Sequence, residues 1–194
     1  MRMSRRAVLH GIGGGGVSFS YTGTYESFGN ETQGFAVLKT SGTLTIAGTV
    51  DLCLVGGGGR GYRGFYSGQN TSSYWVGGGG GAGGFVSNYI QQALDGDYSV
   101  TIGAGSSTQG SAGGQTSVGA SYTANGGNSP TAARNSVTGR GTSGTGASKP
   151  ATANGTNGED GVYPWSDSAN FSSYRVSGCG GGGGVYGIVD YACG

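Results

Sequence analysis

Runs of consecutive glycine constrain the fold of this chain more than any other feature. After residue 55 they occur at 56–59, 77–81 and 180–184. Glycine loses more conformational entropy on ordering than any other residue, so a folded glycine run needs many compensating hydrogen bonds. In the polyproline-II geometry, with three residues per turn, the backbone N–H and C=O groups must find partners in neighbouring segments. The runs therefore predict a scaffold of packed polyglycine-II-type helices.

The composition sets limits on the partners of the chain. Forty-eight of the 194 residues are glycine, only 10% are charged, and the formal net charge is +1. A nearly neutral chain has no strong electrostatic attraction for nucleic acid or for an acidic membrane. Glycine at this density is typical of disorder. The 12 Tyr, 6 Phe and 2 Trp, together with several alternating segments, indicate a folded protein instead.

Apolar and polar residues alternate with a period of two before the first glycine run, which predicts strands. The segments are 17–21, 43–46 and 50–55, with a short apolar run at 34–39 and a turn expected at 47–48. In the last strand, one face carries Val50, Leu52 and Leu54, and the other carries Asp51, Cys53 and Val55.

Few elements of regular structure are predicted beyond residue 56. Residues 98–102 alternate and predict one more strand, and 91–94 is the one stretch that could make a helical turn. The predicted fold class is mainly β with irregular extended structure: a small antiparallel β-module and a glycine-rich scaffold, with almost no α-helix. The predicted domains are an N-terminal docking arm at 1–16, a β-rich module at 17–55, and a glycine-rich domain with aromatic loops at 56–194.

The first glycine run lacks the sequence context of two nucleotide-binding motifs. Gly56, Gly58 and Gly61 satisfy the G-x-G-x-x-G pattern of dinucleotide-binding folds. That pattern requires a helix directly after the third glycine and an acidic residue about 20 positions on. The sequence after Gly61 has no helical period, and the next acidic residue is Asp95. No glycine run is followed by Lys-Ser or Lys-Thr, so a P-loop is excluded as well.

The residues needed for catalysis or metal binding are also missing. The single histidine is His10, and no C-x-x-C motif occurs among Cys53, Cys179 and Cys193. Neither a zinc set nor a nucleophile with a histidine base can be assembled. We expect a non-enzymatic protein with no metal and no cofactor. The cysteines are expected to be free thiols, with a Cys179–Cys193 bridge as the alternative.

The N-terminus is basic, with Arg2, Arg5 and Arg6. The apolar stretch after them is too short for a signal peptide, and no run approaches the ≈18 apolar residues of a membrane-spanning helix. We expect a protein made in the cytoplasm, with no membrane insertion and a short docking arm at its start.

Over about residues 17–194 the sequence resembles the glycine-rich domain found in tail proteins of phages and prophages, and the segments 19–23 and 40–44 look like its N-terminal strands. The resemblance is carried by the strand and glycine entry at 50–59, the second glycine block at 77–86, the Y-x-V-x-I-G-x-G strand at 98–105, the blocks at 113–117 and 124–127, and the last block at 180–184. It implies a virion component similar to tail-fibre adhesins that stack polyglycine-II helices and present receptor-binding loops between them.

The resemblance also implies roles for individual residues. The scaffold would be built by Gly56, Gly57, Gly58, Gly59, Gly77, Gly78, Gly79, Gly80, Gly81, Gly180, Gly181, Gly182, Gly183 and Gly184. Aromatic and arginine side chains dominate binding hot spots, and two inserts contain them. The receptor-binding candidates are Tyr62, Arg63, Phe65, Tyr66, Tyr74, Trp75, Tyr163, Trp165, Tyr174 and Arg175.

The expected partners are other virion proteins, bound through Arg2, Arg5 and Arg6, and a host surface receptor, either a saccharide or an outer-surface protein. A homotrimer is expected by analogy with fibre proteins. One alternative is a purely structural virion subunit, such as a decoration, head-fibre or baseplate component. A remote alternative is a glycine-rich RNA-binding protein, because 60–66 resembles one RGG-type segment with aromatic residues.

Overall fold

The computed structural model describes residues 7–10, 17–29, 34–63, 65–67, 74–76, 81–131, 160, 184–186 and 191–193. All the regular elements within these ranges are β-strands, and no helix occurs there, as the sequence predicted. The strands are β1 (Ala7–His10), β2 (Ser18–Tyr21), β3 (Tyr25–Gly29), β4 (Gly34–Leu38), β5 (Gly42–Val55), β6 (Phe65–Ser67), β7 (Tyr74–Val76), β8 (Val86–Thr101), β9 (Thr116–Val118), β10 (Tyr122–Ala124), β11 (Gly184–Tyr186) and β12 (Tyr191–Cys193).

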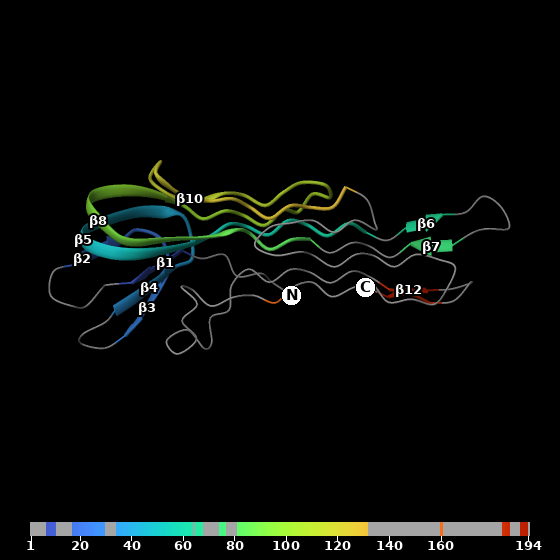
Figure 1. Ribbon diagram of the computed structural model, residues 1–194, viewed down its shortest axis with the longest axis horizontal. Helices are drawn as coiled ribbons and strands as arrows, with labels where there is room; N and C mark the ends of the chain where they lie inside the picture. The colour runs from blue at the N-terminus through green and yellow to red at the C-terminus, as the bar shows by residue number, and fades with distance from the viewer. Residues whose placement is uncertain are drawn as a thin grey trace.

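Eight of these strands form one antiparallel sheet (Figure 1). Its order is β10-β9-β8-β5-β1-β4-β3, and β2 also pairs with β5. The long strands β5 and β8 pair along almost their whole length. On the opposite edge of β5, β2 pairs with 44–47 and β1 pairs with 51–54. The hairpin pairs β6–β7 and β11–β12 form two small separate sheets.

Both long strands bend in the middle. Gly48 of β5 has a φ of 136°, and Gly96 of β8 has a φ of 114°. The two glycines lie close in the ladder, since Gly48 pairs with Leu94 and Ile46 with Gly96. Glycine inside a strand often marks a tight bend, because it tolerates backbone angles that strain other residues. The predicted turn at 47–48 is therefore a bend within one continuous strand, not a chain reversal.

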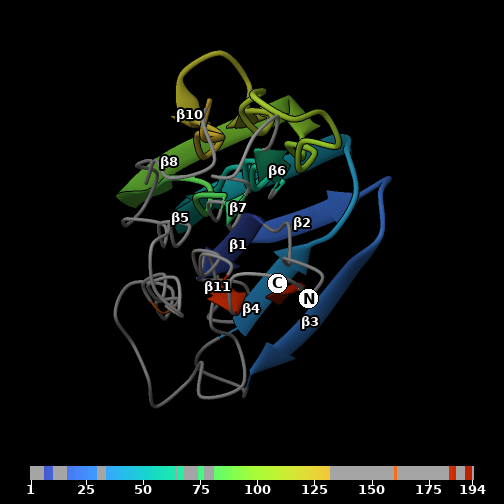
Figure 2. The same ribbon diagram turned by 90° about the vertical axis from the view of Figure 1, so that its right-hand side faces the viewer.

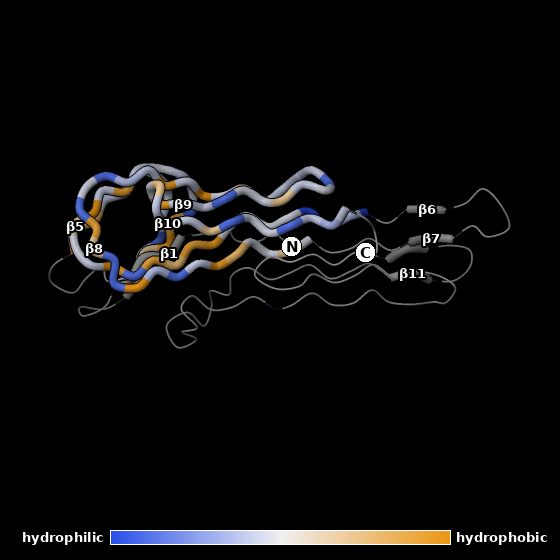
Figure 3. The backbone as a smooth tube through the Cα atoms, turned by 45° about the horizontal axis from the view of Figure 1, so that its top comes forward, coloured by the Kyte–Doolittle hydropathy of each residue, from blue (hydrophilic) through white to orange (hydrophobic). Residues whose placement is uncertain are grey.

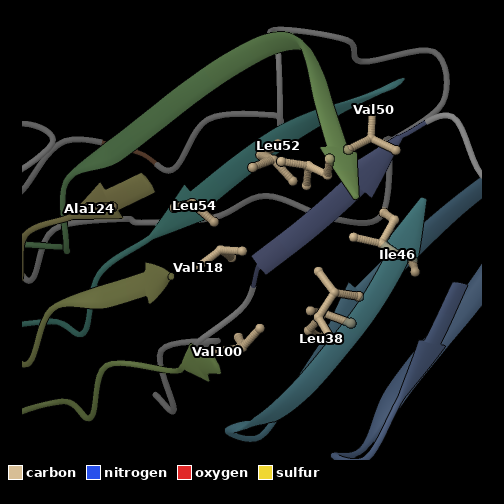
Figure 4. Close-up of a cluster of buried hydrophobic side chains, with 11 residues drawn as sticks. Leu38, Ile46, Val50, Leu52, Leu54, Val100, Val118 and Ala124 are labelled. Atoms are coloured by element: carbon tan, nitrogen blue, oxygen red, sulfur yellow. The ribbon is translucent and has the colours of Figure 1, made fainter. Parts of the chain in front are cut away.

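The bend brings the two halves of β5 onto one hydrophobic core (Figure 4). Leu44 and Ile46, before the bend, and Leu52 and Leu54, after it, belong to the same cluster and are at most 1% exposed. The other members of the cluster come from β4, β5, β8, β9 and β10: Ala36, Leu38, Val50, Leu94, Val100, Val118 and Ala124. The face predicted for Val50, Leu52 and Leu54 is thus the core face.

The opposite face of the second half of β5 is buried too. Cys53 is fully buried and Val55 is 1% exposed, although neither belongs to the core cluster. In β4, Phe35 and Val37 are buried in the same alternating relation to Ala36 and Leu38. This part of the sheet therefore lies inside the protein on both of its faces, and the Cys53 thiol is buried in it.

A β-bulge follows the bend and explains the acidic residue in β5. The register of β5 against β8 shifts between Val50 and Leu52. Across from it, Gln91 has a φ of 50°, in the left-handed region that L-residues seldom adopt. The Asp51 carboxylate accepts a hydrogen bond from the Gln91 backbone N–H at 2.7 Å. Asp51 therefore holds the backbone at the point where the ladder is irregular.

Two parts of the sequence-based domain division change. Residues 7–10 fall in the range expected as a docking arm, but they form strand β1, which lies inside the sheet between β5 and β4. Residues 91–94, the one stretch with helical potential, lie within β8. The sheet also includes β8, β9 and β10, so the β-module extends well beyond residue 55.

Candidate functional site

Five glycine-containing segments run side by side away from the sheet (Figures 1 and 3). We call them the glycine shaft; they comprise residues 56–60, 81–85, 103–106, 113–115 and 125–128. None of them is a β-strand. They are held together by backbone hydrogen bonds between segments. Figure 2 looks along the shaft, with the strands of the sheet behind it.

The hydrogen bonds in the shaft repeat every three residues. The Gly56 N–H donates to Phe85 O at 3.0 Å, and the Gly59 N–H donates to Ala82 O at 2.8 Å. The donor advances by three residues, from Gly56 to Gly59, while the acceptor moves back by three, from Phe85 to Ala82. These two segments therefore run antiparallel. In a β-ladder, one neighbour is met at every second residue. A repeat of three is the period of the polyproline-II helix.

The second segment repeats this pattern with a different neighbour. The N–H groups of Ala82 and Phe85 donate to Asn128 O and Asn125 O at 3.0 and 2.9 Å. The segment 81–85 therefore accepts from one neighbour and donates to another, again at a spacing of three.

The first segment has four hydrogen-bonded neighbours. Besides its bonds to 81–85, Gly57 donates to Gly114 O and accepts from the Gly127 N–H, and Gly58 O accepts from the Ser106 N–H. At any one position, a strand in a sheet has two edges and so at most two hydrogen-bonded neighbours. Four neighbours and a period of three are features of packed polyglycine-II helices, which is the arrangement the glycine runs predict.

The shaft segments can approach one another at backbone distance because their glycines have no Cβ atoms. A Cβ added to Gly84 would lie 1.8 Å from Gly56 O, and one added to Gly57 would lie 2.1 Å from Ala104 O. At Gly113 and Gly126 the nearest backbone oxygens would be 2.0 and 1.9 Å away. The obstacle is backbone in each case, so it cannot rotate away. The Gly56 and Gly57 N–H groups are used inside the protein, which agrees with the exclusion of a phosphate-binding loop.

Two buried hydroxyls bracket the first glycine segment. Thr116 and Ser129 are the buried polar side chains among the described residues. Thr116 Oγ1 donates to Val55 O at 2.7 Å and accepts from the Gly103 N–H at 2.9 Å. It therefore closes the end of the segment next to the sheet.

Ser129 makes the equivalent pair of bonds at the far end. Its Oγ donates to Arg60 O at 2.5 Å and accepts from the Gly110 N–H at 3.0 Å. The guanidinium of Arg60 also donates to Ser107 O. Gly110 and Ser107 belong to the turn at 106–111, which joins two shaft segments. Arg60 and Ser129 thus connect three parts of the chain where the insert begins.

The sequence profile of a family described as a glycine-rich domain matches residues 39–193. This match spans more than half of the chain. The chain belongs to the glycine-rich domain family. The match starts before β5, so the family region includes the two bent strands as well as the shaft. No curated protein and no solved structure matches the chain.

The structure places only part of the predicted binding residues of this glycine-rich domain. Tyr62 is half-buried and Arg63 is exposed, directly after the shaft. In the β6–β7 hairpin, the Cα partners are Phe65 with Val76, Tyr66 with Trp75, and Ser67 with Tyr74. The first insert therefore brings four of its candidate positions into one hairpin.

The remaining predicted residues lie outside the described ranges. These are Tyr163, Trp165, Tyr174 and Arg175 of the second insert, the glycines at 77–80 and 180–183, and Arg2, Arg5 and Arg6 of the docking arm. Gly81 lies in the shaft, and Gly184 begins β11.

No motif in the sequence of the glycine-rich domain marks Arg60, Thr116 or Ser129 as residues that fix the shaft. The one sequence feature that could have indicated a role for Arg60 is its position directly after a glycine run. Single hydroxyl residues in a chain rich in Ser and Thr give no signal of burial, because the partners of Thr116 and Ser129 are backbone atoms distant in sequence.

The described ranges show few features of other kinds of site. They contain no group of three or more His, Cys, Asp or Glu side chains placed to hold a metal ion. They also contain no helix of the length and apolar character needed to span a bilayer. A shallow groove of about 620 Å³ lies at the bend of β5 and β8, lined in part by Ser18, Thr49 and Asp95. It lies at the opposite end of the structure from β6 and β7 (Figure 1).

Proposed function

We propose that this glycine-rich domain is a phage virion surface protein of the tail-fibre or adhesin type. Its insert at 60–76 would contact a host surface receptor, and the shaft would hold that insert away from the sheet. The observation that supports the proposal is the shaft itself. A bundle in which one segment bonds to four neighbours is a stiff spacer, and it ends where an aromatic-rich insert begins.

The residue types of the insert support a binding role. It contains Tyr, Trp, Phe and Arg residues within 17 positions, and such residues supply large contact areas with little loss of rotamer entropy. Aromatic rings also suit the apolar faces of sugar rings, which favours a saccharide receptor. The second insert, with Tyr163, Trp165, Tyr174 and Arg175, would add to the same surface under this proposal.

The test uses purified, fluorescently labelled protein and cells of a panel of candidate host bacteria. We expect saturable binding to cells, and we expect Trp75→Ala and Trp165→Ala to weaken it at least tenfold with an unchanged melting temperature. The matched control is Tyr25→Ala, which removes an exposed ring of β3 outside both inserts. If both tryptophan variants bind like the unmodified protein, the loop assignment is wrong.

A purely structural virion subunit is the second candidate, and the shaft also favours it, because a stiff spacer needs no ligand. In that case the protein would be found in purified particles, and the tryptophan variants would impair assembly rather than adsorption. Mass spectrometry of particles and the genes flanking this one separate the two candidates from a glycine-rich RNA-binding protein. An RNA-binding protein would bind single-stranded RNA in a strongly salt-dependent manner. Sedimentation of the purified protein tests the proposed trimer.

A further inference from the structure

The region where the shaft ends and the insert begins is fixed by specific side chains. Ser129 is 7% exposed and uses its hydroxyl twice, toward Arg60 O and from the Gly110 N–H. The Arg60 side chain reaches the same turn through Ser107 O. Three segments distant in sequence therefore meet at the first residue of the insert.

The returning end of the insert is fixed at backbone distance. A Cβ on Gly81 would lie 2.1 Å from Gly59 O and 2.7 Å from the carbonyl carbon of Arg60. The two ends of the insert are thus in contact through glycine, and β6 and β7 continue the same antiparallel course. An insert held at both ends by backbone contact still needs something to set its direction, because glycine contacts have no side chains that interlock.

The turn at 106–111 can provide this direction, because hydrogen bonds within it hold its own conformation. The Ser106 hydroxyl donates to Thr108 O at 2.9 Å, the Thr108 N–H donates back to Ser106 Oγ at 3.2 Å, and the Ser111 N–H donates to Thr108 O at 3.2 Å. Ser106 is joined to the shaft through Gly58 O. Arg60 is therefore held by a turn that is fixed to the same shaft.

We infer that Arg60 and Ser129 are positioning residues, which hold Tyr62, Arg63 and the strands β6 and β7 of the insert in one orientation on the shaft. They would act through the backbone of Arg60, without contacting a ligand. This inference extends the proposed function, because a fixed direction of the insert lowers the entropy lost on binding a receptor. The orientation itself can be measured without any receptor.

The chain offers a closely matched control. Thr116 makes the same two kinds of bond as Ser129, donating to a carbonyl and accepting from a backbone N–H, but at the opposite end of the shaft. Ser129→Ala and Thr116→Val each delete one buried hydroxyl. Only the first deletion affects the residue that begins the insert.

The experiment measures the time-resolved fluorescence anisotropy of Trp75. The chain has two tryptophans, so Trp165→Phe leaves Trp75 as the single reporter. In this background we expect the Trp75 anisotropy to decay mainly with the tumbling of the whole molecule. Ser129→Ala is expected to add a fast decay component, and Thr116→Val is expected to lack it, although both variants lower the melting temperature. Arg60→Ala, an exposed substitution, is expected to add the same component and covers the case in which Ser129→Ala does not fold.

Three outcomes would overturn the inference. The first is a fast Trp75 component already present in the unsubstituted background. The second is an unchanged decay in both Arg60→Ala and Ser129→Ala. The third is an equal effect of Thr116→Val, which would indicate general loosening of the shaft. A protein that fails to bind cells but gives the expected anisotropy refutes the proposed function and leaves the positioning role intact.

Discussion

The Thr116 hydroxyl donates a 2.7 Å hydrogen bond to Val55 O, at the residue where β5 passes into the glycine shaft. The Thr116 hydroxyl oxygen also accepts a hydrogen bond from the Gly103 N–H, which lies just after β8 has passed into the shaft. One buried side chain therefore fixes two segments as they leave the sheet. The extended backbone of each segment begins in register with the other.

Thr116→Val is expected to destabilise the protein. It keeps the shape of the side chain but leaves a buried carbonyl and a buried N–H without their hydroxyl partner, at a cost of about 1–3 kcal/mol for each unsatisfied group. Thr116→Ser is the control, because it keeps the hydroxyl and removes one methyl group, worth about 0.8 kcal/mol. Urea unfolding measures both variants. A smaller loss in Thr116→Val than in Thr116→Ser would mean that the methyl group matters more than the hydroxyl.

Gly84→Ala is expected to disrupt the shaft. The new Cβ would lie 1.8 Å from Gly56 O and 2.2 Å from its carbonyl carbon, so two backbone segments must separate. We expect a loss above about 4 kcal/mol, in the range reached only by severe steric or cavity defects. Gly96→Ala is the comparison: its Cβ meets nothing within 4 Å, but its φ is +114°, so a backbone strain of about 1–3 kcal/mol is expected. Similar melting temperatures for the two variants would contradict the packing argument.

Two substitutions at the β-bulge are expected to change the stability of the protein in opposite directions. Asp51→Ala removes the acceptor of the Gln91 N–H and is expected to cost about 0.5–1.5 kcal/mol. Gln91→Gly relieves a positive φ of 50° and is expected to be neutral or to stabilise by up to about 1 kcal/mol. Chemical denaturation of both variants checks the signs. A destabilising Gln91→Gly would mean that the Gln91 side chain, and not its backbone angle, is what matters.

Tyr21 is expected to make stability depend on alkaline pH. Burial raises the pKa of the Tyr21 hydroxyl above its ordinary value, and the hydroxyl donates to Thr40 O. The folded state therefore holds this proton more tightly than the unfolded state. The contribution is complete below about pH 10 and is lost as the pH rises through the folded pKa. Tyr21→Phe is expected to reduce the decline of the unfolding free energy above about pH 10. An identical decline in both proteins would refute this.

Cys53 is expected to resist alkylation in the folded state. Its side chain is fully buried in a part of the sheet that is covered on both faces. Iodoacetamide should therefore modify Cys53 only as fast as the sheet opens, and the rate should rise with urea in parallel with global unfolding. Peptide mapping by mass spectrometry separates Cys53 from the other two cysteines. Rapid labelling in the absence of denaturant would show that this face opens locally.

The sequence allowed the main features of the fold to be predicted where local chemistry decides them. Alternation predicted β2 and the two halves of β5, a short apolar run predicted β4, and the glycine runs predicted a backbone-packed scaffold. The bend at Gly48 was predicted as a turn, because a glycine in the sequence marks a chain reversal and a bend within a strand equally well. β1 was predicted as part of an arm, because a four-residue strand is stabilised by β4 and β5 rather than by its own sequence.

The site was predicted less completely, for a related reason. Tyr62 and Arg63 were identified by residue type, but the residues that fix the insert act through backbone atoms. Ser129 is one serine among many in the sequence, and only the fold brings its hydroxyl to Arg60 O. A hydrogen bond between residues 69 positions apart leaves no pattern that a sequence period can reveal.

The three-residue repeat of the shaft has a consequence for how such proteins can diverge. A glycine segment displaced by three residues meets its neighbour with the same atoms, so the glycine runs by themselves do not specify alignment. Alignment must come from the few positions that are not interchangeable, such as Ala82 within the bundle and the hydroxyls of Thr116 and Ser129 at its two ends. Loops between the segments can then change in length and composition while the bundle beneath them is conserved in form. An architecture of this kind separates the part that is held constant from the part that is free to vary.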